Sequence, residues 1–171
     1  VTYGGFNQIL FEKDSFKVNP VFPPKSLQKM LMLFYIGRND ERFSSDYAKN
    51  WIENIPKRTT ELHALRYLVE LGIAIIRTGA DIDEFGCILD EAWFLKRSLS
   101  NVISNDKVDT IYALAKKHGA LGGKLLGAGG EGFMLFYVPK RKQEAIKNAL
   151  SGQTLVPFRF ENGGCKHFKI S

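Results

Sequence analysis

The pattern of apolar positions predicts strands near the start of the chain. Two runs rich in apolar residues, Phe6–Phe11 and Phe16–Val18, are separated by the turn-forming residues 13–15, which is typical of two strands joined by a turn. After three prolines, a continuous apolar run follows at Met30–Ile36, and Gly37 ends it. A run of this kind favours a central strand that is buried on both faces.

The middle of the chain has the apolar spacing of helices. The third of four helical segments is the clearest, because its apolar residues recur every three or four positions and form one stripe. Asp81 is expected to cap its start, with Glu84 three positions later. The predicted helical segments are Asp46–Asn54, Thr60–Arg77, Asp81–Val102 and Asp106–Lys117.

Strand patterns return after the helices. We expect a strand over Phe133–Val138, a helix over Arg141–Leu150, and closing strands over Leu155–Phe160 and Lys166–Ile170. Both alternating sets of residues in Phe133–Val138 are apolar, so both of its faces are expected to be buried. Strands on either side of a helical block predict an α+β fold, in which an antiparallel or mixed sheet is covered by helices.

The composition is that of a globular domain. The chain has 171 residues, of which 44% are hydrophobic and 25% charged, which argues against a disordered chain or a disulfide scaffold. No apolar run approaches the roughly 18 residues that span a bilayer, so no membrane partner is expected. Two cysteines favour a reducing cytoplasm as the location, and the scattered histidines indicate no metal site. The chain enters a strand soon after Val1, from which we expect a fragment of a longer protein.

The basic charge is concentrated near the C-terminal end. The net charge is +6, and residues 139–171 contribute +5 of it, from seven Lys and Arg against two Glu. Such a surface attracts nucleic acid or a phosphorylated ligand, or is simply solvated. Residues 130–138 have a faint similarity to the aromatic strand of an RNA-recognition domain, but the helical block is too large for that domain. Nucleic acid is therefore an alternative and not the expected partner.

A glycine-rich segment at residues 119–132 is the most informative part of the sequence. Seven of its fourteen residues are glycine, which indicates backbone with positive φ or backbone lying close to another group. Successive N–H groups in such a segment can hold a phosphate, and Lys124 adds a positive charge. Residues 127–132 fit the G-x-G-x-x-G pattern but precede a strand instead of a helix. A tight connection between packed strands explains the glycines equally well.

Three segments resemble a known enzyme superfamily. The run Gly-Gly-Lys-Leu-Leu-Gly-Ala-Gly-Gly-Glu-Gly-Phe at 122–133 resembles the third conserved motif of the GHMP kinases, which include galactokinase and the homoserine and mevalonate kinases. Residues 89–104 and Tyr3-Gly-Gly-Phe-Asn7 are similar to the bacterial D-glycero-D-manno-heptose phosphate kinases. The resemblance extends over nearly the whole chain. Glu131 departs from the motif, because it stands where a third consecutive glycine is usual, and its carboxylate would repel a phosphate.

The resemblance implies a ferredoxin-like C-terminal domain that closes over the phosphates of ATP and over part of a sugar pocket. ATP and Mg²⁺ would be bound mainly by an N-terminal half, whose phosphate loop and catalytic Asp are absent from this sequence, so the chain alone is expected to be inactive. Residues 1–24 would be the end of the N-terminal domain or inter-domain strands, and residues 25–171 the C-terminal domain. The implied partners are the N-terminal kinase domain and a sugar phosphate. A homodimer through apolar surface at residues 3–11 is a further expectation.

The predicted site residues follow from the resemblance and from charge. The resemblance implies no catalytic residue in this chain, and it implies contact with the nucleotide phosphates by Lys124, Gly127, Ala128, Gly129, Gly130, Glu131 and Gly132. A sugar phosphate needs cations, and we expect Arg38 and Arg42 first, then Lys96 together with Trp93. Arg38 also suits a solvated loop, and Trp93 also suits a core position beside the apolar stripe. Heptose specificity rests on the resemblance alone, and galactose, fucose or another hexose are alternatives.

Overall fold

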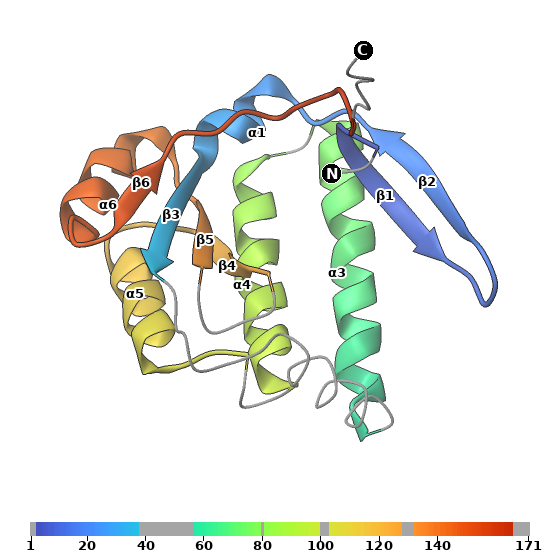
Figure 1. The fold of residues 1–171 in the computed structure, drawn as a ribbon, viewed down its shortest axis with the longest axis horizontal. Coiled ribbons are helices and arrows are strands. Elements are labelled where there is room, and N and C mark those ends of the chain that lie inside the picture. Colours follow the sequence, from blue (N-terminus) through green and yellow to red (C-terminus); the bar gives the residue numbers. More distant parts are fainter. Residues whose placement is uncertain (1–2, 38–56, 80, 100–102, 128–131, 166–171) are drawn as a thin grey trace, which may run out of the picture.

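The computed structural model describes residues 3–37, 57–79, 81–99, 103–127 and 132–165. Its elements are arranged as an α+β fold (Figure 1), which confirms the predicted fold class. They are β1 (Phe6–Phe11), β2 (Phe16–Val21), α1 (Lys25–Met30), β3 (Leu31–Gly37), α3 (Thr59–Thr78), α4 (Asp83–Ser98), α5 (Asp106–Lys117), β4 (Gly122–Leu126), β5 (Gly132–Tyr137), the 3₁₀ turn η2 (Lys140–Lys142), α6 (Gln143–Ala149) and β6 (Thr154–Val156).

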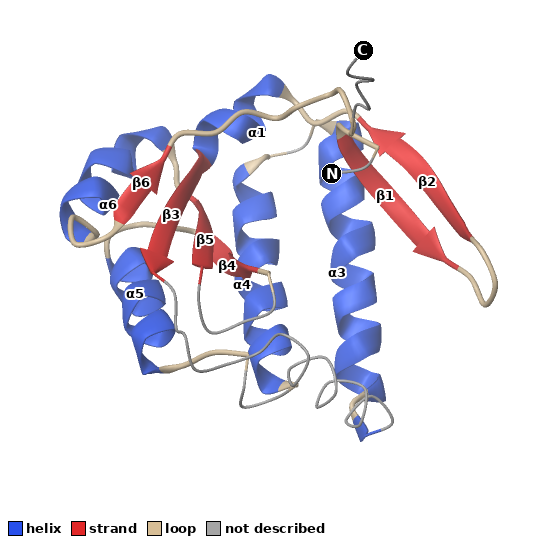
Figure 2. Ribbon diagram, in the orientation of Figure 1, coloured by secondary structure: helices blue, strands red, loops and turns tan. Residues whose placement is uncertain are grey.

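The described strands form two sheets (Figure 2). β1 and β2 pair with each other, and the larger sheet has the order β4-β5-β3-β6 with every neighbouring pair antiparallel. α3 lies between the two-stranded sheet and α4. None of the helices in the described ranges is both long and apolar enough to span a membrane.

The two faces of the four-stranded sheet are covered unequally. One face is fully buried under residues of α5 and α6 together with Trp93 of α4. Its side chains are at most 5% exposed; they are Met32, Phe34, Ile36, Leu125, Met134 and Phe136. On the opposite face Tyr137 is buried, but Tyr35 is 38% and Phe133 39% exposed. The predictions that Met30–Ile36 and Phe133–Val138 are buried on both faces were therefore wrong. The apolar cluster that covers this second face surrounds Tyr137 at one end of it.

Strand β4 was not predicted, because its sequence begins with two glycines. Both glycines are needed for close packing: a Cβ on Gly122 would overlap the carbonyl oxygen of Gly86 and lie 2.5 Å from the backbone N of Asp90. A Cβ on Gly123 would lie 2.6 Å from the carbonyl oxygen of Leu135. The tight strand connection that was one explanation of the glycines therefore holds for this part of the segment. Here α4 packs backbone against backbone on β4.

The described helices agree with the sequence pattern except at the two ends of α4, which ends at Ser98 and not at the predicted Val102. α3, α5 and α6 lie where helices were predicted, whereas α4 begins at Asp83 and not at Asp81. The Asp81 carboxylate nevertheless accepts a hydrogen bond from the Asp83 backbone N at 3.0 Å. Within α4, Gly86 and Trp93 are fully buried. Of the predicted apolar stripe, Phe85 and Leu89 are half-buried and pack against the cluster around Tyr137, and Leu99, just after the helix, is buried. The predicted helix at 46–54 and the predicted strand at 166–170 lie outside the described residues.

The C-terminal segment forms hydrogen bonds with the N-terminal part of the described chain. β6 ends at Val156, so the strand predicted over Leu155–Phe160 was wrong beyond that residue; Pro157 follows and has no N–H to continue a ladder. Past it, the backbone N of Phe160 donates to the side chain of Gln28 at 3.1 Å. The backbone N of Gly5 donates to the carbonyl of Glu161 at 2.7 Å, close to the start of β1.

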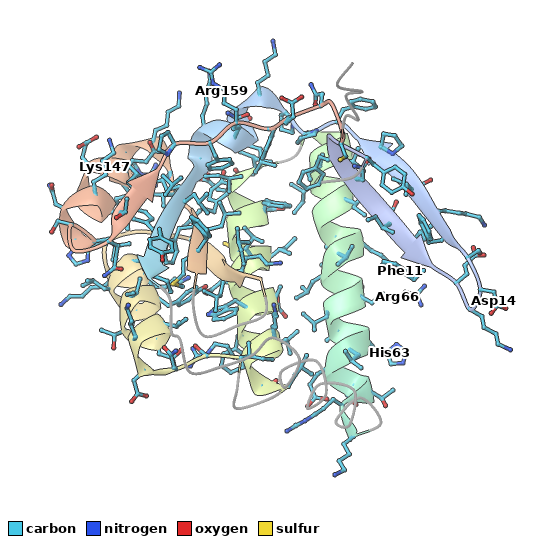
Figure 3. The ribbon with its side chains drawn as sticks, viewed as in Figure 1. Phe11, Asp14, His63, Arg66, Lys147 and Arg159 are labelled. Atoms are coloured by element: carbon cyan, nitrogen blue, oxygen red, sulfur yellow. The ribbon has the colours of Figure 1, made fainter. Side chains whose placement is uncertain are left out.

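Charged side chains of the basic tail point to solvent. Lys147 on α6 and Arg159 in the C-terminal segment are exposed, on the opposite side of the molecule from Asp14 at the hairpin tip (Figure 3). Lys147 forms an ion pair with Glu144 at 2.6 Å, although both side chains remain largely accessible. An arrangement of this kind favours the solvated surface among the interpretations of the tail.

Candidate anion-binding site

Three strands begin or end at the same end of the larger sheet, which we call the glycine-rich edge. β3 ends at Gly37, β4 ends at Leu126, and β5 begins at Gly132, directly opposite Gly37. Gly37, Gly127 and Gly132 have φ of 94°, 87° and 94°, a conformation that favours glycine. The glycine-rich segment thus leaves β4 and enters β5 at this edge. Arg38 and Arg42, and Ala128, Gly129, Gly130 and Glu131, lie outside the described residues, so their predicted roles stay predictions.

Side chains on the half-covered face of the sheet form three cross-strand rows. The strand registers give a packed row (Gly122, Tyr137, Leu31), a middle row (Lys124, Leu135, Leu33) and an edge row (Leu126, Phe133, Tyr35). The packed row is covered, and the edge row lies next to the glycine-rich edge. In the edge row, the rings of Tyr35 and Phe133 lie 5.2 Å apart between centroids. Exposure on this face therefore increases toward the edge where the glycines gather.

Two lysines come close together beside the middle row. Lys124 belongs to that row, and α4 packs along β4 with Gly86 and Asp90 against Gly122. Lys96 follows on the same helix, and the positive charge of Lys124 acts on it. Both side chains are half-buried. Burial lowers the pKa of Lys96, and the positive charge of Lys124 lowers it further. Of the ion pairs between described residues, none includes either lysine. Two neighbouring cations without a carboxylate between them form an electrostatic site for an anion.

A third lysine approaches the same edge from α5. The Nζ atom of Lys107 lies 3.0 Å from the position that a Cβ on Gly37 would take. Lys107 was not predicted, because nothing in its local sequence shows that α5 begins beside the end of β3. Tyr35 and Phe133 were also missed, although the alternation of residues within β3 and β5 places them on one face. The positive charge at this edge therefore comes from α4, α5 and β4.

Trp93 lies in the core. Its side chain is 2% exposed, and its ring lies 6.0 Å from that of Tyr112 on α5. It also lines a pocket of about 290 Å³ between α4 and α5, together with residues such as Phe94 and Arg97. Its Nε1 has no hydrogen-bond partner in the described part of the chain. A ring so deeply buried offers little surface to a sugar, so the structure favours the core alternative for Trp93.

The carboxylates of α4 hold packing contacts. Asp90 accepts hydrogen bonds from the Tyr112 hydroxyl at 2.6 Å and from Lys116 Nζ at 2.7 Å, and Asp83 accepts one from the Tyr137 hydroxyl at 2.9 Å. Burial, followed by these hydrogen bonds, raises the pKa of both tyrosines above the ordinary value. Among the described residues, no three His, Cys, Asp or Glu side chains gather as metal ligands would.

Comparisons with known proteins agree on one family. The model described as "GHMP kinases C terminal" matches residues 69–154. The chain is 31% identical to the D-glycero-alpha-D-manno-heptose 7-phosphate kinase of Campylobacter jejuni, over 99% of this chain and 52% of that relative. A segment of 55 residues is 42% identical to the bifunctional fucokinase/GDP-fucose pyrophosphorylase of Arabidopsis thaliana, covering 32% of this chain and 5% of that protein.

The fold is also similar to that of solved GHMP kinase structures. The mevalonate kinase of L. major, solved in complex with R-mevalonate, superimposes with a TM-score of 0.70 at 18% identity, over 88% of this chain and 45% of that one. The chain thus spans about half the length of the heptose kinase and of the mevalonate kinase. The matched residues 69–154 include α4, α5, β4 and β5, the elements that supply most of the glycine edge and its lysines. The chain therefore belongs to the GHMP kinases, of which it carries the C-terminal domain.

Proposed function

We propose that the chain is the C-terminal half of an ATP-dependent kinase for a D-manno-heptose phosphate. The observation that carries this proposal is the pair Lys96 and Lys124 beside the middle row, one row away from the glycine-rich edge, without a carboxylate partner among the described residues. The similarity to the heptose 7-phosphate kinase over almost the whole chain supports the acceptor. A phosphorylated sugar brings the negative charge that such a pair binds.

Each part of this half has a proposed role. Phosphoryl transfer depends on positioning and on neutralising charge, and Lys96 and Lys124 bring positive charge to the anionic substrates. Lys124, Gly127, Gly132 and the segment between them are proposed to face the nucleotide phosphates, and Arg38 and Arg42 the sugar phosphate. Lys124 is proposed to lie between the two anionic groups, so that together with Lys96 it also contacts the sugar phosphate. When bound, ATP supplies the phosphoryl group and Mg²⁺ neutralises part of its charge. We assign both to the N-terminal half, which would also supply the catalytic Asp.

The partner domain is proposed to dock on the hairpin β1–β2. The hairpin exposes large apolar side chains, with Phe11 81% and Phe16 52% exposed, and the ring of Tyr3 lies 6.2 Å from that of Phe16. Exposed aromatic surface of this kind favours a protein contact. Residues 1–24 are then the end of the N-terminal domain or the strands between the two domains, and residues 25–171 are the C-terminal domain. A homodimer through the same surface is the alternative.

A second acceptor is supported by one observation. The 55 residues that match the fucokinase/GDP-fucose pyrophosphorylase are 42% identical, which exceeds the identity to the heptose kinase, although they cover only 32% of the chain. Fucose carries no phosphate and would not need the lysine pair as an anchor. We therefore place fucose, or another hexose such as galactose, behind a heptose phosphate.

A chimeric enzyme tests the proposal directly. The N-terminal half of the Campylobacter jejuni kinase is joined to this chain, and phosphate transfer from ATP is measured with heptose 7-phosphate, fucose and galactose. We expect transfer to the heptose phosphate, a reduced rate for Lys124→Gln, and an unchanged rate for the exposed control Lys147→Gln. Arg38→Ala should raise the KM for the sugar phosphate more than that for ATP. Transfer by the chain alone would contradict the proposed division of roles, and preferential use of fucose would support the second acceptor.

A further inference from the structure

We propose that the edge row binds the ring of the phosphorylated sugar: Tyr35 and Phe133 pack against the ring while Lys124 and Lys96 bind its phosphate. This inference rests on the proposed function and adds to it the surface that recognises the sugar itself. No residue of the edge row belongs to the predicted site residues. The inference follows from where the strand registers place two exposed aromatic rings relative to Lys124.

The geometry of the edge row suits a small ring-shaped ligand. Tyr35 and Phe133 are cross-strand neighbours on one face, their rings are tilted by 52° to each other, and each is more than a third exposed. Leu126 extends the row on the far side of Phe133. The middle row, with Lys124, lies two residues away along the strands, about 7 Å at the usual rise of a strand. A sugar resting on the rings therefore has its phosphate within reach of the lysines.

The chemistry of the surface matches two different parts of one molecule. The C–H groups on the face of a pyranose ring are apolar and pack against aromatic faces, which is a common role of aromatic side chains in binding sites. The phosphate needs cations, and Lys96 and Lys124 lack a carboxylate partner among the described residues. An unphosphorylated sugar would use only the rings, and inorganic phosphate only the lysines. The combination therefore selects a sugar phosphate over either part alone.

Exposure of an aromatic side chain is not by itself enough to bind a sugar phosphate, as Phe94 shows. Phe94 on α4 is 71% exposed and shares a pocket with Arg97. The Arg97 guanidinium, however, is already bound to the Asp109 carboxylate at 2.5 Å. Phe94 therefore has an aromatic surface without an available cation, and Phe94→Leu is the matched control for Phe133→Leu.

The test follows binding to the 171-residue chain by NMR, with isotope labels on the Tyr and Phe rings. Heptose 7-phosphate and inorganic phosphate are titrated separately into the wild type and into Tyr35→Leu, Phe133→Leu, Phe94→Leu and Lys124→Gln. We expect heptose 7-phosphate, but not inorganic phosphate, to shift the ring signals of Tyr35 and Phe133. The double variant Tyr35→Leu/Phe133→Leu should weaken sugar phosphate binding about tenfold and leave phosphate binding unchanged. Phe94→Leu should change neither, and Lys124→Gln should weaken both.

The outcomes separate this inference from the proposed function. If Lys124→Gln weakens both ligands but the ring variants bind heptose 7-phosphate like the wild type, the inference fails and the proposed function stands. If neither ligand binds, the lysine pair is no anion site, and both proposals lose their basis. Ring signals that change with protein concentration would assign the edge row to a second copy of the chain, and tighter binding of a uridine oligonucleotide would assign it to nucleic acid; either result overturns the inference. If a variant does not fold, the wild type alone tests the inference. It is supported if heptose 7-phosphate shifts the ring signals of Tyr35 and Phe133, and it is contradicted if these signals do not move.

Discussion

The packed row and the edge row belong to the same face of the same three strands, but their surroundings differ completely. In the packed row, Gly122 allows α4 to lie against the sheet, and the ring of Tyr137 is 0% exposed. In the edge row, two aromatic rings of similar size are more than a third exposed. Each row contains an aromatic residue on β5, so the local sequence does not determine burial. The neighbouring helices determine it, by covering one end of the face and leaving the other open.

The two ends also differ in what their polar groups require. The buried hydroxyl of Tyr137 needs a partner and donates to Asp83 at 2.9 Å, because an unpaired buried hydroxyl is costly. At the other end Lys124 and Lys96 stay next to each other without a carboxylate partner among the described residues, which costs stability but leaves positive charge for a ligand. One end of the face stabilises the fold, and we infer that the other end binds.

Truncating an aromatic side chain in each row gives the largest expected difference. Tyr137→Ala should lower the free energy of unfolding by about 3–5 kcal/mol, because it leaves a cavity and removes the partner of Asp83. Phe133→Ala should cost only about 1 kcal/mol, because part of its ring is already in water. Urea unfolding followed by circular dichroism measures both. Equal losses would contradict the contrast between the two rows.

Substitution of Gly122 in the packed row should lower the stability almost as much as truncation of Tyr137. Gly122→Ala places a Cβ against the backbone of Gly86 and Asp90, where neither neighbour is a flexible side chain. We expect a loss of about 1–3 kcal/mol from overpacking. Gly152→Ala is the control, because a Cβ there would meet no atom within 4 Å. If Gly122→Ala unfolds at the same urea concentration as the wild type, α4 does not depend on this close approach.

These contacts show why the sequence predicted some elements and missed others. Helices α3 and α5 were predictable, because an amphipathic period is a local signal that the tertiary fold preserves. β4 was missed, since Gly122 and Gly123 have poor strand propensity and are explained only by α4 and β5 packing against them. The glycine-rich segment and Lys124 were identified from composition and charge, and the resemblance then gave them an expected role at the nucleotide phosphates. The proximity of Lys96 to Lys124, and the exposure of Tyr35, depend on how α4 lies on the sheet, which no short segment encodes.

Phosphate bound at the open end of the face should raise the stability of the chain measurably. Inorganic phosphate at about ten times its Kd should raise the free energy of unfolding by about 1.4 kcal/mol, if it binds only the folded chain. Lys96→Gln should abolish this gain and, without phosphate, stabilise the chain slightly, because burial and the charge of Lys124 both disfavour the charged form of Lys96. Lys147→Gln on α6 is the control and should keep the gain. The measurement is thermal unfolding at constant ionic strength, and an equal gain in all three proteins would indicate a general salt effect and no site.

The smallest expected effect is the alkaline sensitivity of the packed row. Burial and the hydrogen bond to Asp83 raise the pKa of Tyr137 in the folded state, whereas an unfolded tyrosine has a pKa of about 10. Above that pH the unfolded state loses a proton that the folded state retains, so stability falls as the pH rises. Between pH 8 and pH 11, the free energy of unfolding should therefore fall by about 1 kcal/mol less in Tyr137→Phe than in the wild type.

The control for this pH effect is Tyr35→Phe in the edge row, whose ring is 38% exposed. Because each variant is compared with itself at the two pH values, the loss of a hydroxyl at neutral pH cancels from the difference. Urea midpoints at the two pH values provide the measurement. A flatter pH dependence in Tyr35→Phe than in Tyr137→Phe would mean that the edge row holds the more strongly buried hydroxyl, and the contrast between the two ends of the face would be reversed.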